Sequence, residues 1–390
     1  MRLVRRSLIG VALILSCVTV SRALADTARD FTSEIHAVSA VAACGAPAPA
    51  VYDVVTVRNH CRSVATSVAA WKAKWLAPAK PFFATLLEKG YPKTVVYPFG
   101  GGDLLSALAV YPDATEYTTL SLEGMGDPRP ISTLTSARAL RPALAKLNTL
   151  FEMNLSWAWN TTIRLSIDSS DTRGGLPGIL ALTLVALDAN GYEPIAARYF
   201  TLGVDGKITY VTDADVAAWD AKQHDAARKP TNSVQAGLFT NIELQFRAKG
   251  DTSAPVKTFR HIAANLSDDE LARSGGALAH LDTKGSVAAI TKAASYLLWK
   301  PSFGKLRSFL LHHMVVMVSD DTGIPPRYSS PEGFTLDVFG SYRGAHFDFA
   351  SREISKEMVH LWKERPHRHL PFRFGYYDSS GQSHLLFEHK

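Results

Sequence analysis

Four carboxylates in two short stretches could do acid–base chemistry. Asp103 directly follows a run of three glycines, and Glu123 lies twenty positions further on. Asp320 and Asp321 begin a second polar stretch. Hydrolysis by paired carboxylates needs one group that donates a proton and another that accepts a proton or attacks. If the two stretches meet in the fold, Asp103, Glu123, Asp320 and Asp321 are candidate catalytic residues.

The first stretch has the pattern strand, glycine turn, helix, strand. An apolar run ends at Gly100, Gly101 and Gly102, a short helix pattern follows Asp103, and a second strand pattern ends at Glu123. This order places backbone N–H groups and an acidic side chain at the edge of an α/β sheet, where a phosphate or a ribose can bind. The glycines are contiguous, however, whereas dinucleotide-binding loops space them. A tight turn with Asp103 as helix N-cap is the simpler alternative, so we predict ligand contacts from the glycines but no cofactor.

The second stretch runs from Asp320 to Arg327 and contains the tripeptide Asp-Thr-Gly. This tripeptide is typical of aspartic proteases, but their mechanism needs two carboxylates that share a proton, and the sequence has no second copy. The simpler alternative is a turn in which Gly323 and Pro325 end a helix. In a binding site, Arg327 could hold an anionic group with two hydrogen bonds, and Tyr342 is a further candidate ligand-binding residue.

The histidines give little support for a metal centre. His312 and His313 are adjacent in a helix pattern and so point in different directions, and His360, His367 and His369 lie near the end of the sequence. No HExxH motif or zinc-spaced cysteine pair accompanies them, and no Gly-x-Ser-x-Gly motif marks a serine nucleophile. We therefore predict no metal site.

Residues 1–25 have the form of a secretory signal peptide. Three arginines precede an apolar core at residues 8–20, and Ala23 and Ala25 form a small-x-small cleavage site. The core is shorter than the ~20 apolar residues that span a membrane. Lipoprotein anchoring at Cys17 and a twin-arginine signal are the alternatives. We expect a periplasmic or extracellular protein with no transmembrane segment after cleavage.

Removal of the signal peptide changes the charge balance. The whole chain has 42 basic and 36 acidic residues and a net charge of +6, but residues 1–25 hold four arginines and no acids, which leaves +2. No stripe of Lys and Arg with interleaved aromatic residues is present, which argues against nucleic acid as a partner. A small polar ligand or an envelope component remains as the expected partner.

Two cysteines remain after the signal peptide is removed, Cys44 and Cys61. An oxidising compartment favours a disulfide between them. One bridge in a chain of this length holds a corner of the molecule and does not define its fold.

Residues 26–390 are predicted to form a single mixed α/β domain, with a subdivision near residue 170 as the alternative. The βαβ start continues as an antiparallel meander, because strand-like runs at 179–187, 195–204, 207–212 and 242–247 are separated by turn residues. Residues 213–238 are expected to be a surface excursion. Helices that cover the sheet are predicted at 60–75, 136–159, 286–299, 303–318 and 351–362, and further strands at 334–339, 372–376 and 385–387.

Two motifs carry a resemblance to a family. Tyr-Pro-Phe-x-Gly-x-Asp at residues 97–103 and Asp-Asp-Thr-Gly-Ile-Pro at 320–325 are similar to segments of an uncharacterised family of exported bacterial proteins. The similarity extends over most of the chain after the signal peptide, including residues 295–298 and 339–342, although Gly101 stands where a serine or proline is more usual. The resemblance implies export and one continuous fold, and implies no activity.

The sequence therefore supports two functional hypotheses. The first is an exported protein that binds a small polar ligand or an envelope partner through the loops at 100–103 and 320–327, with Glu123 and Tyr342 nearby. The second is an envelope hydrolase that uses carboxylates from the same two loops. Whether the protein is an enzyme stays open at this point.

Overall fold

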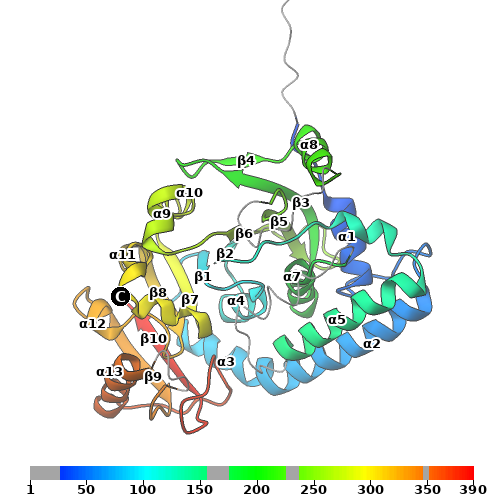
Figure 1. The fold of residues 1–390 in the computed structure, drawn as a ribbon. Helices are drawn as coiled ribbons and strands as arrows, with labels where there is room; N and C mark the ends of the chain where they lie inside the picture. The colour runs from blue at the N-terminus through cyan, green and yellow to red at the C-terminus, as the bar shows by residue number, and fades with distance from the viewer. Residues whose placement is uncertain (1–26, 156–174, 225–236, 346–350) are drawn as a thin grey trace, which may run out of the picture.

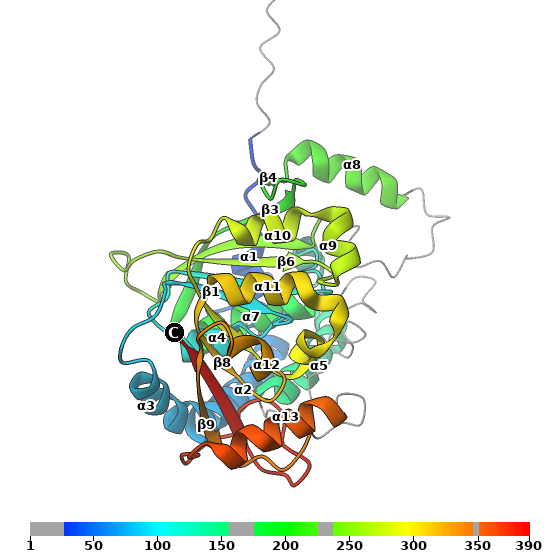
Figure 2. The same ribbon diagram turned by 90° about the vertical axis from the view of Figure 1, so that its left-hand side faces the viewer.

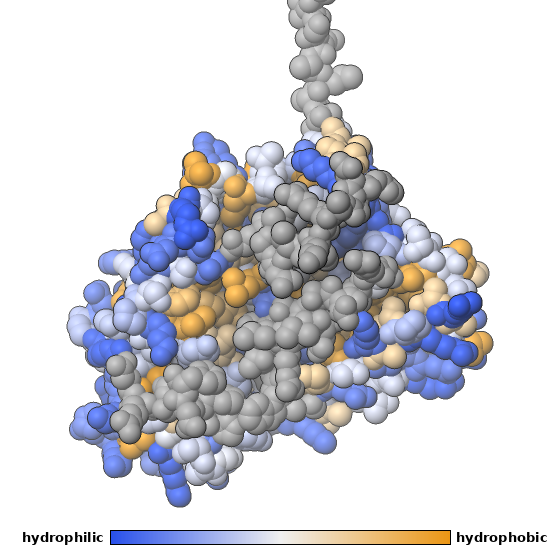
Figure 3. All heavy atoms as spheres, viewed as in Figure 1, coloured by the Kyte–Doolittle hydropathy of each residue, from blue (hydrophilic) through white to orange (hydrophobic). Residues whose placement is uncertain are grey.

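The computed structural model describes residues 27–155, 175–224, 237–345 and 351–390. The predicted signal peptide and Cys17 lie outside these residues. None of the helices in the described ranges is both long and apolar enough to cross a membrane. The face of the molecule seen in Figure 3 mixes hydrophilic and hydrophobic residues, with hydrophilic residues frequent along its lower margin.

A ten-stranded mixed sheet forms the centre of the molecule, as Figure 1 shows. Its five central strands, β6, β2, β1, β7 and β8, are parallel, and antiparallel strands extend it on both sides. In spatial order the strands are β4 (Ile208–Tyr210), β3 (Tyr192–Leu202), β5 (Asn241–Ala248), β6 (Lys257–Ala263), β2 (Glu116–Ser121), β1 (Thr94–Pro98), β7 (Val287–Thr291), β8 (Met314–Ser319), β10 (His384–His389) and β9 (Thr335–Gly340).

Helices cover both faces of the sheet, and Figures 1 and 2 show the two groups. One apolar core lies under α1 (Thr32–Val41), α2 (Val54–Trp71), α3 (Ala77–Leu86), α4 (Leu104–Val110), α5 (Ala137–Leu155) and α7 (Gly178–Ala189). The other lies under α9 (Asp268–Ser274), α10 (Gly276–Asp282), α11 (Gly304–His313) and α13 (Ser351–Glu364). The remaining described α-helices are α8 (Asp213–His224) and the short α12 (Pro326–Ser329). The mixed α/β fold class with helices over the sheet is confirmed.

The order of the parallel strands reverses in the middle of the sheet. Across the sheet they come third, second, first, fourth and fifth along the chain, so the reversal lies between β1 and β7. The connection from β1 to β2 contains α4 on one face, and the connection from β7 to β8 contains α11 on the other. The loops after β1 and β7 therefore diverge to opposite faces, which is where open α/β sheets bind ligands.

The predicted meander is only partly present. The turn at Asp205 and Gly206 does form a β3–β4 hairpin, but β5 pairs with β3 instead of β4, and β6 joins the parallel strands. The first strand predicted for this meander, at 179–187, is wrong: these residues lie in α7. Every residue of α7 except Asp188 is buried, so the helix carries no polar face whose period distinguishes it from a buried strand.

Two predicted helices each prove to contain a strand. The region 286–299 divides into β7 and a 3₁₀ helix at Ala293–Trp299, and the region 303–318 divides into α11 and β8. The β-branched Val315, Val316 and Val318 favour the extended form. Residues 372–376 form no strand, and the expected surface excursion after residue 212 begins with helix α8.

Candidate functional site at the carboxyl edge of the sheet

Asp103 and Lys292 form an ion pair at the point where the strand order reverses. Asp103 follows β1, Lys292 follows β7, and the Lys292 Nζ atom lies 2.7 Å from the Asp103 Oδ2 atom. The Asp103 side chain is 23% exposed and that of Lys292 is 10% exposed. The pair is therefore almost enclosed, and its carboxylate is the more accessible partner.

Asp103 is held by local hydrogen bonds as well. Its Oδ1 atom accepts hydrogen bonds from the Ser106 backbone N–H (3.2 Å) and hydroxyl (2.9 Å), so the predicted N-cap of α4 is confirmed. The Tyr97 hydroxyl donates to Oδ2 at 2.9 Å. Because a carboxylate already occupies this helix end and α4 has only seven residues, the loop is a poor phosphate site.

Lys292 was not among the predicted site residues. Its Nζ atom also lies 2.8 Å from the Ser106 hydroxyl oxygen. Burial lowers the pKa of Lys292, although Asp103 and Asp320 oppose this effect. The only sequence signal is a single lysine after the apolar run 287–291, and this signal has meaning only once that run is known to be a strand.

The backbone is strained on both sides of the ion pair. Among non-glycine residues in the described ranges, only Cys44, Phe99 and Ala293 have positive φ, and Phe99 (60°) and Ala293 (57°) directly follow β1 and Lys292. Such conformations cost roughly 1–3 kcal/mol each and cluster at functional sites. Two of the three strained residues therefore lie in the loops that carry Asp103 and Lys292.

Asp320 joins the second predicted loop to this site, but as a buried acceptor. Its Oδ1 atom accepts from the Thr322 N–H (2.9 Å) and hydroxyl (2.5 Å), and its Oδ2 atom accepts from the N–H groups of Ala293 (3.0 Å) and Tyr376 (3.2 Å). Asp320 has no exposed surface, and burial, together with Asp321, raises its pKa. Asp320 therefore fastens the loop after β8 to the loop after β7.

Asp321 belongs to a second buried cluster. Its Oδ2 atom accepts a hydrogen bond from the Tyr342 hydroxyl at 2.8 Å, and its Oδ1 atom lies 3.2 Å from His384 Nε2. Burial opposes the charged form of His384, but Asp321 and the nearby Asp320 and Asp378 outweigh it and raise the pKa of this histidine. Asp321, Tyr342 and His384 are all at most 5% exposed, so the predicted Tyr342 lies with Asp321 inside the protein.

Glu123 follows β2 and has no ion pair within the described residues. It is 3% exposed, its Oε2 atom has no hydrogen-bond partner among those residues, and burial raises its pKa. His261 fixes the backbone here, because its Nε2 atom donates to the Glu123 carbonyl at 2.7 Å. Glu123 therefore lies at the expected edge of the sheet, but it forms no ion pair there with the described residues.

The remaining predicted ligand residues divide between the site and the surface. Gly101 has a φ of 49°, and a side chain at Gly100 would collide with the ring of Tyr97, so the loop needs glycine to form its tight turn. Arg327 lies elsewhere: it pairs with Glu357 of α13, and its guanidinium stacks 5.0 Å from the ring centre of Trp299.

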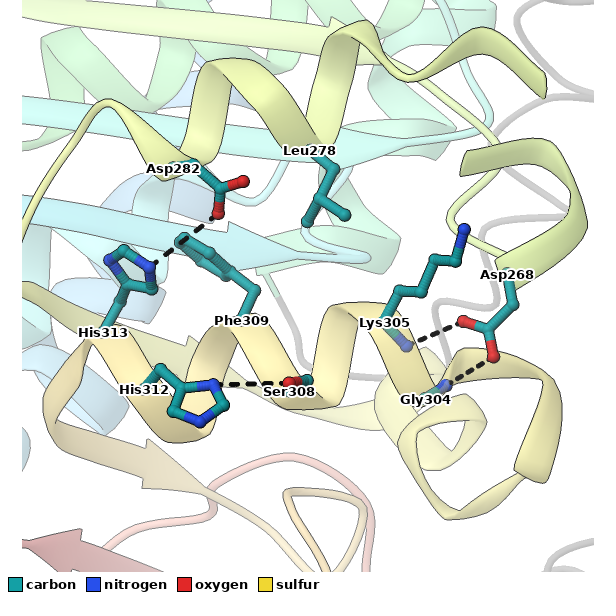
Figure 4. A pocket seen from close by; sticks show the side chains of 9 residues that line it. All are labelled: Asp268, Leu278, Asp282, Gly304, Lys305, Ser308, Phe309, His312 and His313. Atoms are coloured by element: carbon teal, nitrogen blue, oxygen red, sulfur yellow. Dashed lines mark hydrogen bonds and ion pairs between the residues drawn. The ribbon is translucent and has the colours of Figure 1, made fainter. Parts of the chain in front are cut away.

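A separate pocket of about 510 Å³ lies between α9, α10 and α11. Figure 4 shows that His313 points toward Asp282 while His312 points along the helix toward Ser308, as expected for adjacent helical residues. Asp268 accepts from the first N–H groups of α11 and so serves as its cap. No group of three potential metal ligands occurs anywhere in the described ranges.

No family model, curated protein or solved structure matches the chain. The function is therefore inferred from the geometry of the site.

Proposed function

We propose that the protein binds a small polar ligand at the carboxyl edge of its parallel sheet, between the Gly100–Asp103 loop and the Lys292–Ala293 loop. The observation that carries this proposal is the strained backbone at Phe99 and Ala293, on the two strands between which the order reverses. Strain in both loops lowers the stability of the fold. Strained residues cluster at functional sites, and here the two loops hold two polar side chains in place for a ligand.

The chemistry of the pair defines the class of ligand. Asp103 and Lys292 place a carboxylate and an ammonium group 2.7 Å apart, so the pair suits a ligand that can replace part of these contacts with donors and acceptors of its own, such as a polyol or a zwitterion. A phosphate is disfavoured, because the Asp103 carboxylate already lies at the α4 N-terminus.

The hydrolase hypothesis has less support. An acid–base pair needs at least one carboxylate that is free to exchange a proton with a substrate. Asp320 accepts four hydrogen bonds and Asp321 accepts one from Tyr342, and both oxygens of Asp103 are occupied by Ser106, Tyr97 and Lys292. Glu123 forms no ion pair within the described residues, and its Oε2 atom has no hydrogen-bond partner there. We therefore favour binding over hydrolysis.

The test is a ligand screen with a matched pair of lysine variants. Polyols, amino acids and short peptides are screened by thermal shift and the hits are titrated by calorimetry. Lys292→Met should lose the binding of every hit, while Lys284→Met, which removes another buried lysine that pairs with Glu116, should retain it. Hits whose affinity is the same in the wild type and Lys292→Met would contradict the proposal.

We also propose that the chain is exported and that residues 1–25 are removed. The sequence of the leader and the Cys44–Cys61 disulfide support this, since disulfides persist in oxidising compartments. Mass spectrometry of the protein from fractionated cells should find an N-terminus at Asp26 in the exported fraction. A mature chain that begins with a lipid-modified Cys17 would favour the lipoprotein alternative.

A further inference from the structure

A pocket of about 620 Å³ lies at the opposite, amino edge of the sheet. Its walls come from the end of α3, the start of β8, strand β9 and the end of β10, and Figure 2 shows α3 beside β9 and β10. The volume is within the ~300–1,000 Å³ range of pockets that bind small organic molecules. None of the candidate site residues at the carboxyl edge lines it.

Several of the residues that line this pocket are aromatic. The rings of Phe82 and Phe339 meet edge to face with centres 5.0 Å apart, and Phe387 stacks on His389 at 4.9 Å. Phe82, Leu86 and Val315 are only half-buried, so part of their apolar surface is open to the pocket. Such a surface gains from burying a flat ring or an alkyl chain.

The rim of the pocket is mainly basic. Five of its polar side chains carry basic groups, against two acidic ones, Glu88 and Asp337. Asp337 is already paired with Arg368 (3.1 Å) and His389 (3.3 Å). Arg368 is 60% exposed and lies over the ring of Phe339 at 4.7 Å, so its guanidinium group is held at the rim with donors open to solvent or to a ligand.

We propose that this pocket is a second binding site, for an organic anion with an apolar body, such as a medium-chain carboxylate. The apolar part lies on Phe82, Leu86 and Val315, and the carboxylate lies at the rim beside Arg368 and Lys89. The proposal is independent of the ligand at the carboxyl edge, because the two sites share no residue.

The experiment compares three probes with the same eight-carbon chain: octanoate, octanol and octyltrimethylammonium, titrated by calorimetry. Octanoate should bind with one-to-one stoichiometry and most tightly of the three. Leu86→Trp fills the pocket and should weaken octanoate by at least about tenfold. Leu122→Trp, at an exposed leucine outside the pocket, is the matched control and should bind like the wild type.

The charge of the rim is tested separately. The double variant Arg368→Gln, Lys89→Gln should weaken the binding of octanoate about fivefold, as expected for partly screened charges, and leave the affinity for octanol unchanged. Arg365→Gln, outside the pocket, is the control and should change neither affinity. Absence of saturable octanoate binding, binding that Leu86→Trp does not alter, or equal affinity for octyltrimethylammonium would each overturn the proposal. Self-association that is lost in Leu86→Trp would overturn it in favour of a second copy of the chain as occupant.

Discussion

Glu388 illustrates how much a single buried carboxyl can influence this fold. It lies in β10 with no exposed surface, and neither of its carboxylate oxygens nor the neighbouring Ser329 hydroxyl has a hydrogen-bond partner of normal geometry among the described residues. Burial raises the pKa of Glu388 from 4.5 to about 8. The native state therefore keeps a proton on Glu388 at neutral pH, whereas the unfolded chain loses it.

This proton makes stability depend on pH. Between pH 4.5 and about 8 the native state holds one proton more than the unfolded chain at this position, so the contribution of Glu388 to the free energy of unfolding falls by about 1.4 kcal/mol per pH unit as the pH rises. Glu388→Gln should remove this slope and raise the melting temperature at pH 8. Urea denaturation of the wild type and Glu388→Gln from pH 5 to 8.5 measures the free energy of unfolding at each pH. If this free energy has the same pH dependence in both proteins, the raised pKa is contradicted.

Asp320 provides a second test at the residue scale. Its Oδ2 atom accepts from two backbone N–H groups, and an asparagine there must direct its NH₂ group at one set of donors. Asp320→Asn should therefore lower the free energy of unfolding by about 2–4 kcal/mol. Asp251 provides the control, because only its Oδ1 atom accepts from the Ser253 side chain and N–H. Asp251→Asn, at this exposed position, should lower the free energy of unfolding very little. If Asp320→Asn keeps full stability but loses ligand binding, the loop is functional and not structural.

At the scale of elements, the sequence predicted local contacts well and distant ones poorly. The cap that Asp103 makes on Ser106 and the turn at Asp205 and Gly206 depend on neighbours within a few residues, and both are present. The Asp103–Lys292 pair joins residues 189 positions apart. It could not be expected while β7 was assigned to a helix, because a helix would not have placed Lys292 at the edge of the sheet.

The wrong predictions for α7 and β8 have a related cause, which is that both elements are buried. β8 and α7 are both apolar along their length, since each is covered on more than one side, and burial removes the alternation of polar and apolar residues that separates strand from helix. Strand β5, whose sequence alternates polar and apolar residues from Ile242 to Arg247, is confirmed.

An ion-pair ladder connects the antiparallel extension to the parallel strands. Arg198 of β3 pairs with Glu243 of β5, which pairs with Arg260 of β6, which pairs with Glu116 of β2. Glu243 is 3% exposed and also accepts a hydrogen bond from the Tyr210 hydroxyl at 2.9 Å. Burial alone would raise the pKa of Glu243, but its arginine and tyrosine partners lower it, so the charge is retained.

Glu243→Gln should lower the free energy of unfolding by about 2–3 kcal/mol, because it removes the buried charge that accepts hydrogen bonds from Arg198 and Arg260. Glu193→Gln on the neighbouring strand removes a more exposed pair with Arg247 and should cost less than about 1 kcal/mol. Chemical denaturation of both variants measures the difference. Equal losses would mean that the ladder is no stronger than a surface pair.

At the scale of the whole molecule, the Cys44–Cys61 disulfide restrains the N-terminal helices. It joins Cys44, which follows α1, to Cys61 in the middle of α2, 17 positions further along the chain. The sequence predicted this bridge. In the chain-entropy model a loop of this length contributes ~3 kcal/mol. The Cys44→Ser, Cys61→Ser double variant should lose about that amount in urea denaturation, and a reductant should produce the same loss in the wild type but none in the variant.

The position of β10 sets the order in which the sheet can be assembled. This strand lies between β8 and β9, yet it follows both along the chain. Because a ribosome releases a chain from its N-terminal end, β9 emerges before the strand that connects it to the sheet. Until residues 384–389 arrive, β8 keeps an open edge on that side within the described sheet, and an open edge is a template for pairing with another chain. A protein released early would therefore be prone to aggregate at β8, and completion of this side of the sheet waits for translation to pass residue 389.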